Sequence, residues 1–264
     1  MFFAWMCLWI GAIGGVPLVL GWLTGNPLPG FLLGYASASG ICLSVYFLGL
    51  GRGYRIGDFT LIYPLGRALP ILLLVGFDLW RGRGIDLPGY FGILAVAAGC
   101  VLLVGNGRSP SAGKAGPIAA AWVLMIAMGT VGYTAIDKLA MERVVTGNWM
   151  VAFQYGCLQF AFAFPLLWIA LRRLNGNAAG VRNGTPAAVV LIVAGTNLLS
   201  YVLILVVYQI VAHASYVLAL RQFSIVIGVV LGALLFREPA PRARVPAAVI
   251  ITAGVLLIAF AMAQ

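Results

Sequence analysis

Long apolar stretches fill most of the chain, and short polar segments rich in Gly and Pro separate them. The stretches do not alternate between apolar and polar positions, which predicts helices, because a lipid-exposed chain must satisfy its backbone hydrogen bonds internally. A helix needs about 20 residues to cross the hydrocarbon core of a bilayer. The pattern predicts an all-α polytopic membrane protein with nine spans, at 1–23, 31–50, 59–80, 88–105, 117–139, 149–171, 186–209, 214–236 and 245–263.

The composition agrees with this pattern. Of the 264 residues, 63% are hydrophobic and 8% are charged, whereas about a quarter of the residues of a soluble domain are charged. A soluble globular fold is therefore excluded, and the spans leave no room for a separate water-soluble domain. We expect a multi-pass protein of the cell (inner or plasma) membrane, in contact with the lipid bilayer.

The net charge of +10 arises from 16 Lys and Arg residues against six Asp and Glu residues. Most of the cations lie in the short loops, in pairs such as Arg81 with Arg83 and Arg172 with Arg173. This distribution is typical of orientation signals and of contacts with lipid headgroups. Nucleic acid is not expected as a partner, because its binding would need a solvated basic face.

Metal, cofactor and enzyme chemistry are not expected from the reactive side chains. The four cysteines are isolated within apolar stretches, without the spacing of metal ligands. The six acids are scattered over the chain, and no DxxD, HExxH or GxSxG motif occurs. A membrane-embedded enzyme would need clustered acids for a metal, or a nucleophile with a base.

Polar side chains repeat at one spacing on two spans and predict an internal repeat. On span 31–50 the positions i, i+4, i+7 and i+11 are Tyr35, Ser39, Cys42 and Tyr46. On span 186–209 the same positions are Asn197, Tyr201, Ile204 and Tyr208. We call these two sets the polar stripes. Each lies on a single helical face.

Two further pairs of spans also correspond, 59–80 with 214–236 and 88–105 with 245–263. The members of each pair are five spans apart, and an odd number reverses the direction across the membrane, so the halves form an inverted repeat. A five-plus-five plan needs one more helix before Met1, which favours a truncated start. The alternative is that weak similarity among Leu, Val, Ala and Gly residues arose from composition alone.

Several motifs, in this order and spacing, resemble EamA-type transporters of the drug/metabolite transporter superfamily. They are Gly57-Asp-Phe-Thr-Leu-Ile-Tyr-Pro-Leu-Gly-Arg67, Tyr133-Thr-Ala-Ile-Asp-Lys138, Leu218-Ala-Leu-Arg221, Leu235-Phe-Arg-Glu238 and Ala253-Gly-Val-Leu-Leu-Ile. The resemblance implies ten helices in two inverted five-helix repeats that move a small metabolite by alternating access. On this plan residues 1–106 form the first EamA-like repeat, without its first helix, and residues 117–264 form the second.

Arginines are the first candidates for a substrate site. Ionisable groups inside a membrane are costly, so each is a functional hypothesis. Arg67 and Arg221 each lie several residues inside an apolar run, and two guanidinium groups could hold a carboxylate or a phosphate bidentately. The alternative is that one or both extend to a lipid headgroup or stabilise a helix end.

Asp137 is a candidate site for a coupling ion, because it shares a helical face with Thr130 and Tyr133. The neighbouring Lys138 instead favours a helix end at the membrane interface, where the carboxylate would be solvated or paired. The stripe residues Tyr35, Ser39, Tyr46, Asn197, Tyr201 and Tyr208 are candidates for substrate binding, with Tyr155 and Gln159 as additions. Their alternative role is to hold helices together or to lie in an interfacial aromatic belt.

We therefore expect a secondary transporter that exports a small polar metabolite, such as an amino acid or a related anion. Two other functions stay open from the sequence. One is a membrane-embedded enzyme that modifies lipids, and the other is a non-transporting or lipid-sugar flippase subunit of the same fold. The sequence does not specify the oligomeric state.

Overall fold

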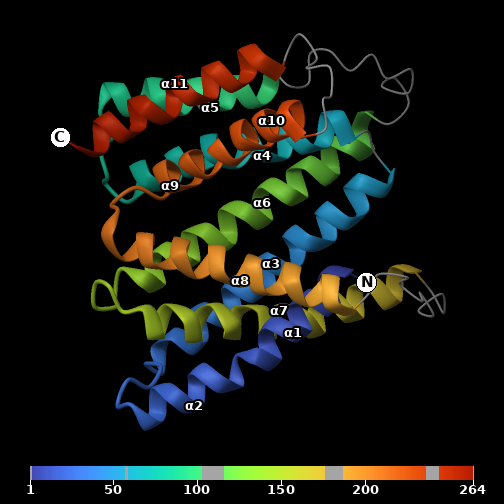
Figure 1. The fold of residues 1–264 in the computed structure, drawn as a ribbon, viewed down its shortest axis with the longest axis vertical. Helices are drawn as coiled ribbons and strands as arrows, with labels where there is room; N and C mark the ends of the chain where they lie inside the picture. The colour runs from blue at the N-terminus through green and yellow to red at the C-terminus, as the bar shows by residue number, and fades with distance from the viewer. Residues whose placement is uncertain (1, 57–58, 103–115, 176–186, 236–243, 264) are drawn as a thin grey trace. The chain divides into compact units, whose positions relative to one another are not determined.

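The computed structural model describes residues 2–56, 59–102, 116–175, 187–235 and 244–263, and regular structure in these residues is entirely helical (Figure 1). The helices are α1 (Phe2–Ile13), α2 (Gly15–Leu23), α3 (Phe31–Ile56), α4 (Phe59–Trp80), α5 (Leu87–Leu102), α6 (Gly116–Met141), α7 (Trp149–Asn175), α8 (Ala187–Ile210), α9 (Ala214–Arg221), α10 (Phe223–Leu235) and α11 (Arg244–Met262). The all-α prediction is confirmed for this part of the chain. Residues 57, 58, 236, 237 and 238 of the quoted motifs lie outside it, as does most of the predicted boundary between the halves.

Six helical segments of the described chain are long and apolar enough to cross a membrane. They are Phe2–Leu23, Phe31–Tyr54, Ala120–Met141, Trp149–Leu174, Ala187–Ile210 and Val245–Met262. Two further apolar helices, Leu87–Leu102 and Ala214–Gly228, are shorter. The chain has the character of a multi-pass integral membrane protein, and the count of nine spans stays a prediction.

The first predicted span is divided at Gly14 into α1 and α2. Pro17 accounts for this break, because proline has no N–H and its ring occupies the space beside the carbonyl group of Ile13. The backbone N–H of Gly14 still bonds to the carbonyl oxygen of Ile10 at 3.1 Å. The two helices therefore follow one another with a local break in the hydrogen-bond ladder.

The eighth predicted span is divided at Gln222 into α9 and α10. The backbone N–H of Gln222 bonds to the carbonyl oxygen of Ala219 at 3.0 Å, three residues back, as in a 3₁₀ turn. The side-chain amide of Gln222 donates to the carbonyl oxygen of Leu218 at 3.1 Å. The side-chain amide of Gln222 thus donates to the carbonyl oxygen that would accept the backbone N–H of Gln222 in a regular α-helix.

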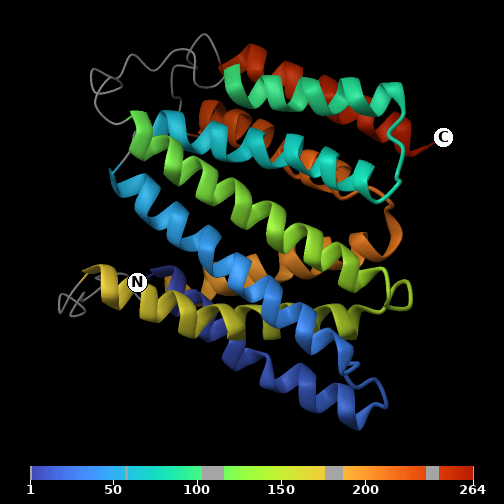
Figure 2. The same cartoon turned by 180° about the vertical axis from the view of Figure 1, so that it is seen from behind.

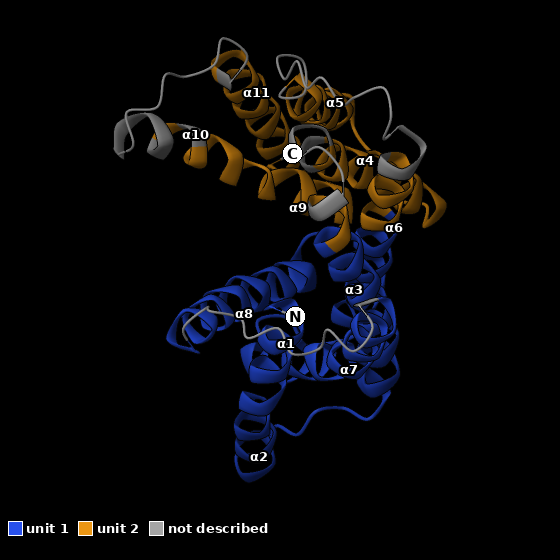
Figure 3. Cartoon of the chain, turned by 90° about the vertical axis from the view of Figure 1, so that its right-hand side faces the viewer, with its two compact units in different colours: residues 1–51, 128–211 blue, residues 52–127, 212–264 orange. Residues whose placement is uncertain are grey.

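The chain divides into two compact units (Figure 3). Unit 1 contains residues 1–51 and 128–211, and unit 2 contains residues 52–127 and 212–264. Each unit combines helices from both predicted halves, since α1 and α2 share unit 1 with α7 and α8. The predicted halves are therefore not the same as the compact units. The division of the sequence into two repeats, 1–106 and 117–264, stays a prediction.

Glycines set close helix contacts within unit 1. A methyl group added at Gly129 of α6 would lie 2.7 Å from the backbone nitrogen of Tyr46 in α3. A methyl group added at Gly40 of α3 would lie 2.8 Å from the carbonyl oxygen of Gln159 in α7. Small residues at these crossings let the backbones approach. Polar side chains from α3, α6 and α7 can therefore meet inside unit 1.

Within unit 2, α5 and α11 lie side by side (Figures 1 and 2). A methyl group added at Gly92 would lie 2.8 Å from the carbonyl oxygen of Gly254, and one at Gly99 would lie 3.1 Å from that of Ala247. The contact positions rise along α5 and fall along α11, so the two helices are antiparallel. An inverted repeat requires this direction for spans 88–105 and 245–263, although the repeat itself stays a prediction.

Substituting Gly92 by Ala is expected to lower the free energy of unfolding by about 1–3 kcal/mol, the usual cost of overpacking. The added methyl would lie 2.7 Å from Cγ1 of Ile258 and 2.8 Å from the carbonyl oxygen of Gly254, so the two helices must separate. Thermal unfolding in detergent measures the effect. The matched control is Gly195→Ala, because a methyl group there meets nothing within 4 Å. Equal unfolding temperatures for the two variants would contradict the packing argument.

Candidate functional site

A cluster of polar side chains surrounds Asp137 in unit 1. Asp137 lies near the carboxyl end of α6 and is fully buried. Its Oδ1 accepts hydrogen bonds from Ser39 Oγ at 2.5 Å and from Tyr155 Oη at 2.8 Å, and its Oδ2 accepts one from Tyr201 Oη. Hydroxyl groups from α3, α7 and α8 thus converge on one carboxylate.

The side-chain amide of Gln159 orients two of these hydroxyl groups. Its Nε2 donates to Ser39 Oγ at 2.7 Å and to Tyr201 Oη at 2.9 Å. Because both hydroxyl oxygens accept from the amide, their hydrogens are free to point at Asp137. Asp137, Ser39, Gln159 and Tyr201 therefore form a closed hydrogen-bonded ring, which we call the Asp137 ring.

Aromatic packing holds the Asp137 ring away from water. The ring of Tyr201 packs edge-on against Phe160, with centroids 5.6 Å apart, and against Tyr133, with centroids 6.3 Å apart. Ser39, Gln159 and Asp137 are fully buried. The low-polarity surroundings strengthen the hydrogen bonds and make an unpaired polar atom costly.

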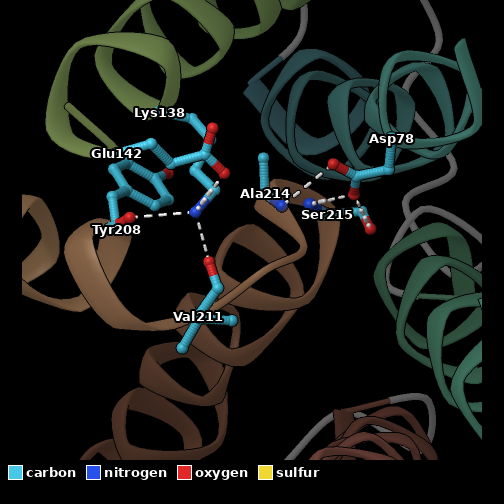
Figure 4. Close-up of polar contacts among 7 residues, drawn as sticks. All are labelled: Asp78, Lys138, Glu142, Tyr208, Val211, Ala214 and Ser215. Carbon is cyan, nitrogen blue, oxygen red and sulfur yellow. Dashed lines mark hydrogen bonds and ion pairs between the residues drawn. The ribbon is translucent and has the colours of Figure 1, made fainter. Parts of the chain in front are cut away.

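Lys138 follows Asp137 directly but has other partners. Its ammonium group donates to the carbonyl oxygen of Tyr208 at 2.9 Å and to that of Val211, and pairs with Glu142 Oε1 at 2.9 Å (Figure 4). Consecutive residues of a helix point about 100° apart, so Lys138 reaches the carboxyl end of α8 while Asp137 faces the ring. Within the described residues, the hydrogen-bond donors around Asp137 are neutral hydroxyl and amide groups.

The charge of Asp137 is therefore stabilised by hydrogen bonds instead of an ion pair. Burying an ion costs several kcal/mol unless its hydrogen-bonding capacity is satisfied. Three O–H donors meet that need for the ionised carboxylate. The alternative interpretation, in which Asp137 is solvated or paired with Lys138, is therefore wrong. A buried site that holds a negative charge can bind a proton or another cation.

The structure brings together residues from both polar stripes. Ser39 belongs to the first stripe and Tyr201 to the second, and both donate to Asp137. Tyr155 and Gln159, which the sequence suggested as additions, complete the cluster. These residues share one site, and their part in binding a substrate stays a prediction.

Four stripe candidates remain, namely Tyr35, Tyr46, Asn197 and Tyr208. Tyr208 is buried and the other three are half-buried. The guanidinium group of Arg143 lies 5.3 Å from the ring centroid of Tyr35, and the ring of Tyr46 is 5.8 Å from that of Tyr133. Their roles as substrate ligands also stay predictions.

Arg67 and Arg221 lie in unit 2. Arg67 is in α4, Arg221 is the last residue of α9, and both are half-buried. Neither arginine belongs to the unit that holds Asp137. Their role in holding an anion stays a prediction.

Unit 2 has a buried carboxylate of its own, Asp78, near the end of α4. Its Oδ1 accepts from the backbone N–H of Ala214 at 3.1 Å, and its Oδ2 accepts from the N–H and the hydroxyl of Ser215 at 2.9 and 2.6 Å (Figure 4). A carboxylate at the first turn of a helix satisfies N–H groups that lack helical partners and interacts favourably with the helix dipole. Asp78 therefore stabilises the start of α9.

Sequence reasoning did not assign these two helix-end contacts. Asp78 is the single acid of an otherwise apolar run, and Lys138 ends another, which were the available signals. The helix ends that they bind, near 211 and 214, are distant in sequence. Only the tertiary fold shows which helix end each charge reaches.

The fold and the site define an apolar, multi-pass helical chain with a buried carboxylate inside a polar ring. No protein-family model matches the chain, and no curated protein matches it. The assignment of a function therefore depends on the site.

Proposed function

We propose that the chain is a secondary transporter of the membrane, which exports a small polar metabolite, such as an amino acid or a related anion, by alternating access. The observation that carries the proposal is the fully buried Asp137 on a helix long enough to span a membrane. Carboxylates in such positions are costly and typically mark ion or substrate pathways. The motif resemblance to EamA-type transporters supports the same function.

In this proposal Asp137 takes up the coupling ion, and the polar stripes supply hydroxyl and amide groups along the pathway. The Asp137 ring supports the first role, because it holds a negative charge without a cationic side chain. Arg67 and Arg221 hold the anionic group of the substrate. Guanidinium groups suit this role, since they remain charged and bind carboxylates in a bidentate manner.

Purified protein in proteoliposomes tests the proposal, with radiolabelled alanine, glutamate, lysine and malate as probes. We expect at least one probe to accumulate against its gradient when a pH or sodium gradient is imposed. Protein-free liposomes are the control for leakage. Uptake equal to this control for every probe and gradient would contradict transport of these substrate classes, and turnover of a lipid by the purified protein would favour an enzyme.

Arg67→Ala and Arg221→Ala test the anion site. Each substitution is expected to weaken the apparent affinity for an anionic probe by about tenfold, the effect of losing about 1.4 kcal/mol of binding free energy. Concentration series of uptake measure the affinity, and uptake of radiolabelled cadaverine, the diamine that lacks the carboxylate of lysine, is the matched readout without this dependence. Unchanged affinity in both variants would reject the anion site and leave the transporter assignment in place.

A further inference from the structure

Every hydrogen-bond donor around Asp137 has an acceptor only when Asp137 is ionised. Three hydroxyl groups donate to the carboxylate, and both N–H groups of Gln159 donate to two of these hydroxyl oxygens. A hydroxyl group has one hydrogen, so none of the three has another to give. The ring therefore fits the charged form of Asp137.

One acceptor in the ring lacks a partner. The amide oxygen Oε1 of Gln159 is buried and makes no hydrogen bond, although its nitrogen makes two. A buried unpaired acceptor costs about 1–3 kcal/mol. The side chain therefore has an unmet capacity for one more hydrogen, next to Ser39 and Tyr201.

We propose that the Asp137 ring is a proton-binding site and that the amide of Gln159 rotates when Asp137 is protonated. This inference rests on the proposed function for its part in transport. Protonation transfers H⁺ from hydronium to a carboxylate oxygen, which forms one O–H bond and releases water. No electron transfer and no co-reactant are involved.

Protonation changes the direction of the hydrogen bonds. The new O–H of Asp137 must donate to a neighbouring hydroxyl oxygen, and that hydroxyl must turn its own hydrogen elsewhere. Gln159 Oε1 is the unpaired acceptor beside Ser39 and Tyr201, and rotation of the amide brings it to face them. Gln159 is thus a positioning residue that links the charge of Asp137 to contacts between α7 and its neighbours α3 and α8.

A metal ion fits this geometry less well than a proton. Cations bound by oxygen ligands at about 2.3–2.6 Å need those oxygens to be about 3 Å or more apart. The oxygens of Ser39 and Tyr155 lie 2.5 and 2.8 Å from Oδ1 of Asp137, at hydrogen-bonding distances. A proton neutralises the carboxylate without displacing any of them.

The other titratable groups near Asp137 do not obscure its titration. They are Tyr155 on α7, Tyr201 on α8 and Cys42 on α3, with Tyr133 on α6 packed against Tyr201. All four are neutral when protonated. The nearby charges of Lys138 and Glu142 pair with each other at the end of α8.

Infrared difference spectroscopy of the purified full chain tests the proposal without substrate. On acidification we expect a carboxylic-acid band that is lost in Asp137→Asn and retained in Asp78→Asn. With side-chain ¹³C-labelled glutamine, the band assigned by Gln159→Met, or by Gln159→Asn if that variant does not fold, shifts at the same midpoint. In Asp137→Asn the Gln159 band stays constant with pH.

Gln154 is the matched control, since it lies on the same helix, is fully buried and donates to the carbonyl oxygen of Pro17 at 2.8 Å, away from Asp137. Its band, assigned by Gln154→Met, is expected to stay constant with pH. A Gln159 band that does not move, or a carboxylic-acid band that Asp137→Asn retains, would overturn the proposal. So would a loss of the band when sodium replaces choline at constant pH.

The infrared experiment and the proteoliposome experiment together separate this inference from the proposed function. A chain that titrates as described but transports no probe retains the proton site and loses the transporter assignment. A chain that transports a probe but shows no titration of Asp137 retains the transporter assignment and loses the proton site.

Discussion

Replacing Asp137 by Asn is expected to lower gradient-driven accumulation of a transported probe by about 100-fold, near the upper end of coupling free energies of ~1–3 kcal/mol. Asn has nearly the same shape and keeps an acceptor for the hydroxyl donors, so the helices should still pack. It has no carboxylate to protonate, and the coupling step is lost. Exchange of labelled for unlabelled substrate at equal concentrations should persist, because exchange needs no net movement of the coupling ion.

The control for this experiment is Asp86→Asn, which removes an exposed carboxylate between α4 and α5. It should accumulate and exchange the probe as the wild-type chain does. Accumulation by Asp137→Asn at the wild-type level would show that Asp137 does not couple transport. Loss of both accumulation and exchange, with normal thermal unfolding, would place Asp137 in substrate binding instead.

Replacing Asp78 by Ala is expected to lower the free energy of unfolding by about 3 kcal/mol, because buried donors lose their acceptor. The substitution leaves the N–H groups of Ala214 and Ser215 without the carboxylate that they contact. Asp78→Asn retains one acceptor oxygen and should cost about 1 kcal/mol. Thermal unfolding in detergent measures both variants.

The carboxylate-matched control for stability is Asp86→Ala, since this side chain is exposed. Asp86 directly precedes α5, so we expect its replacement to cost at most the ~1 kcal/mol typical of a lost N-cap residue, well below the cost of Asp78→Ala. If Asp78→Ala unfolds at the temperature of Asp86→Ala, then Asp78 does not stabilise the start of α9. A transport defect in Asp78→Asn with normal stability would give this residue a functional role that the account does not include.

The helical architecture was largely predictable because span length and composition are local properties of the sequence. The predicted runs 31–50 and 149–171 correspond to α3 and α7. The break at Gly14 was also accessible, since Pro17 removes a helical hydrogen bond. The break at Gln222 had no such signal, because it depends on a side chain that bonds to its own helix.

Asp137 shows why the site was only partly predictable. The stripe spacing marked Ser39 and Tyr201 as polar positions on buried faces, and helical periodicity alone gave that result. The charges that follow Asp137 suggested a solvated helix end, because sequence neighbours were assumed to be spatial partners. In the structure Lys138 contacts the end of α8, and this partner could not be inferred without the packing of α6 against α8.

Proton movement during transport shows directly whether Asp137 couples the flux of the probe to that of protons. Proteoliposomes that contain a trapped pH-sensitive dye receive a gradient of a transported probe, and the internal pH is recorded for the wild type and for Asp137→Asn. We expect the probe gradient to change the internal pH in the wild type and to leave it unchanged in Asp137→Asn. Probe movement without any pH change in the wild type, or equal pH changes in both proteins, would show that Asp137 does not couple proton movement to transport.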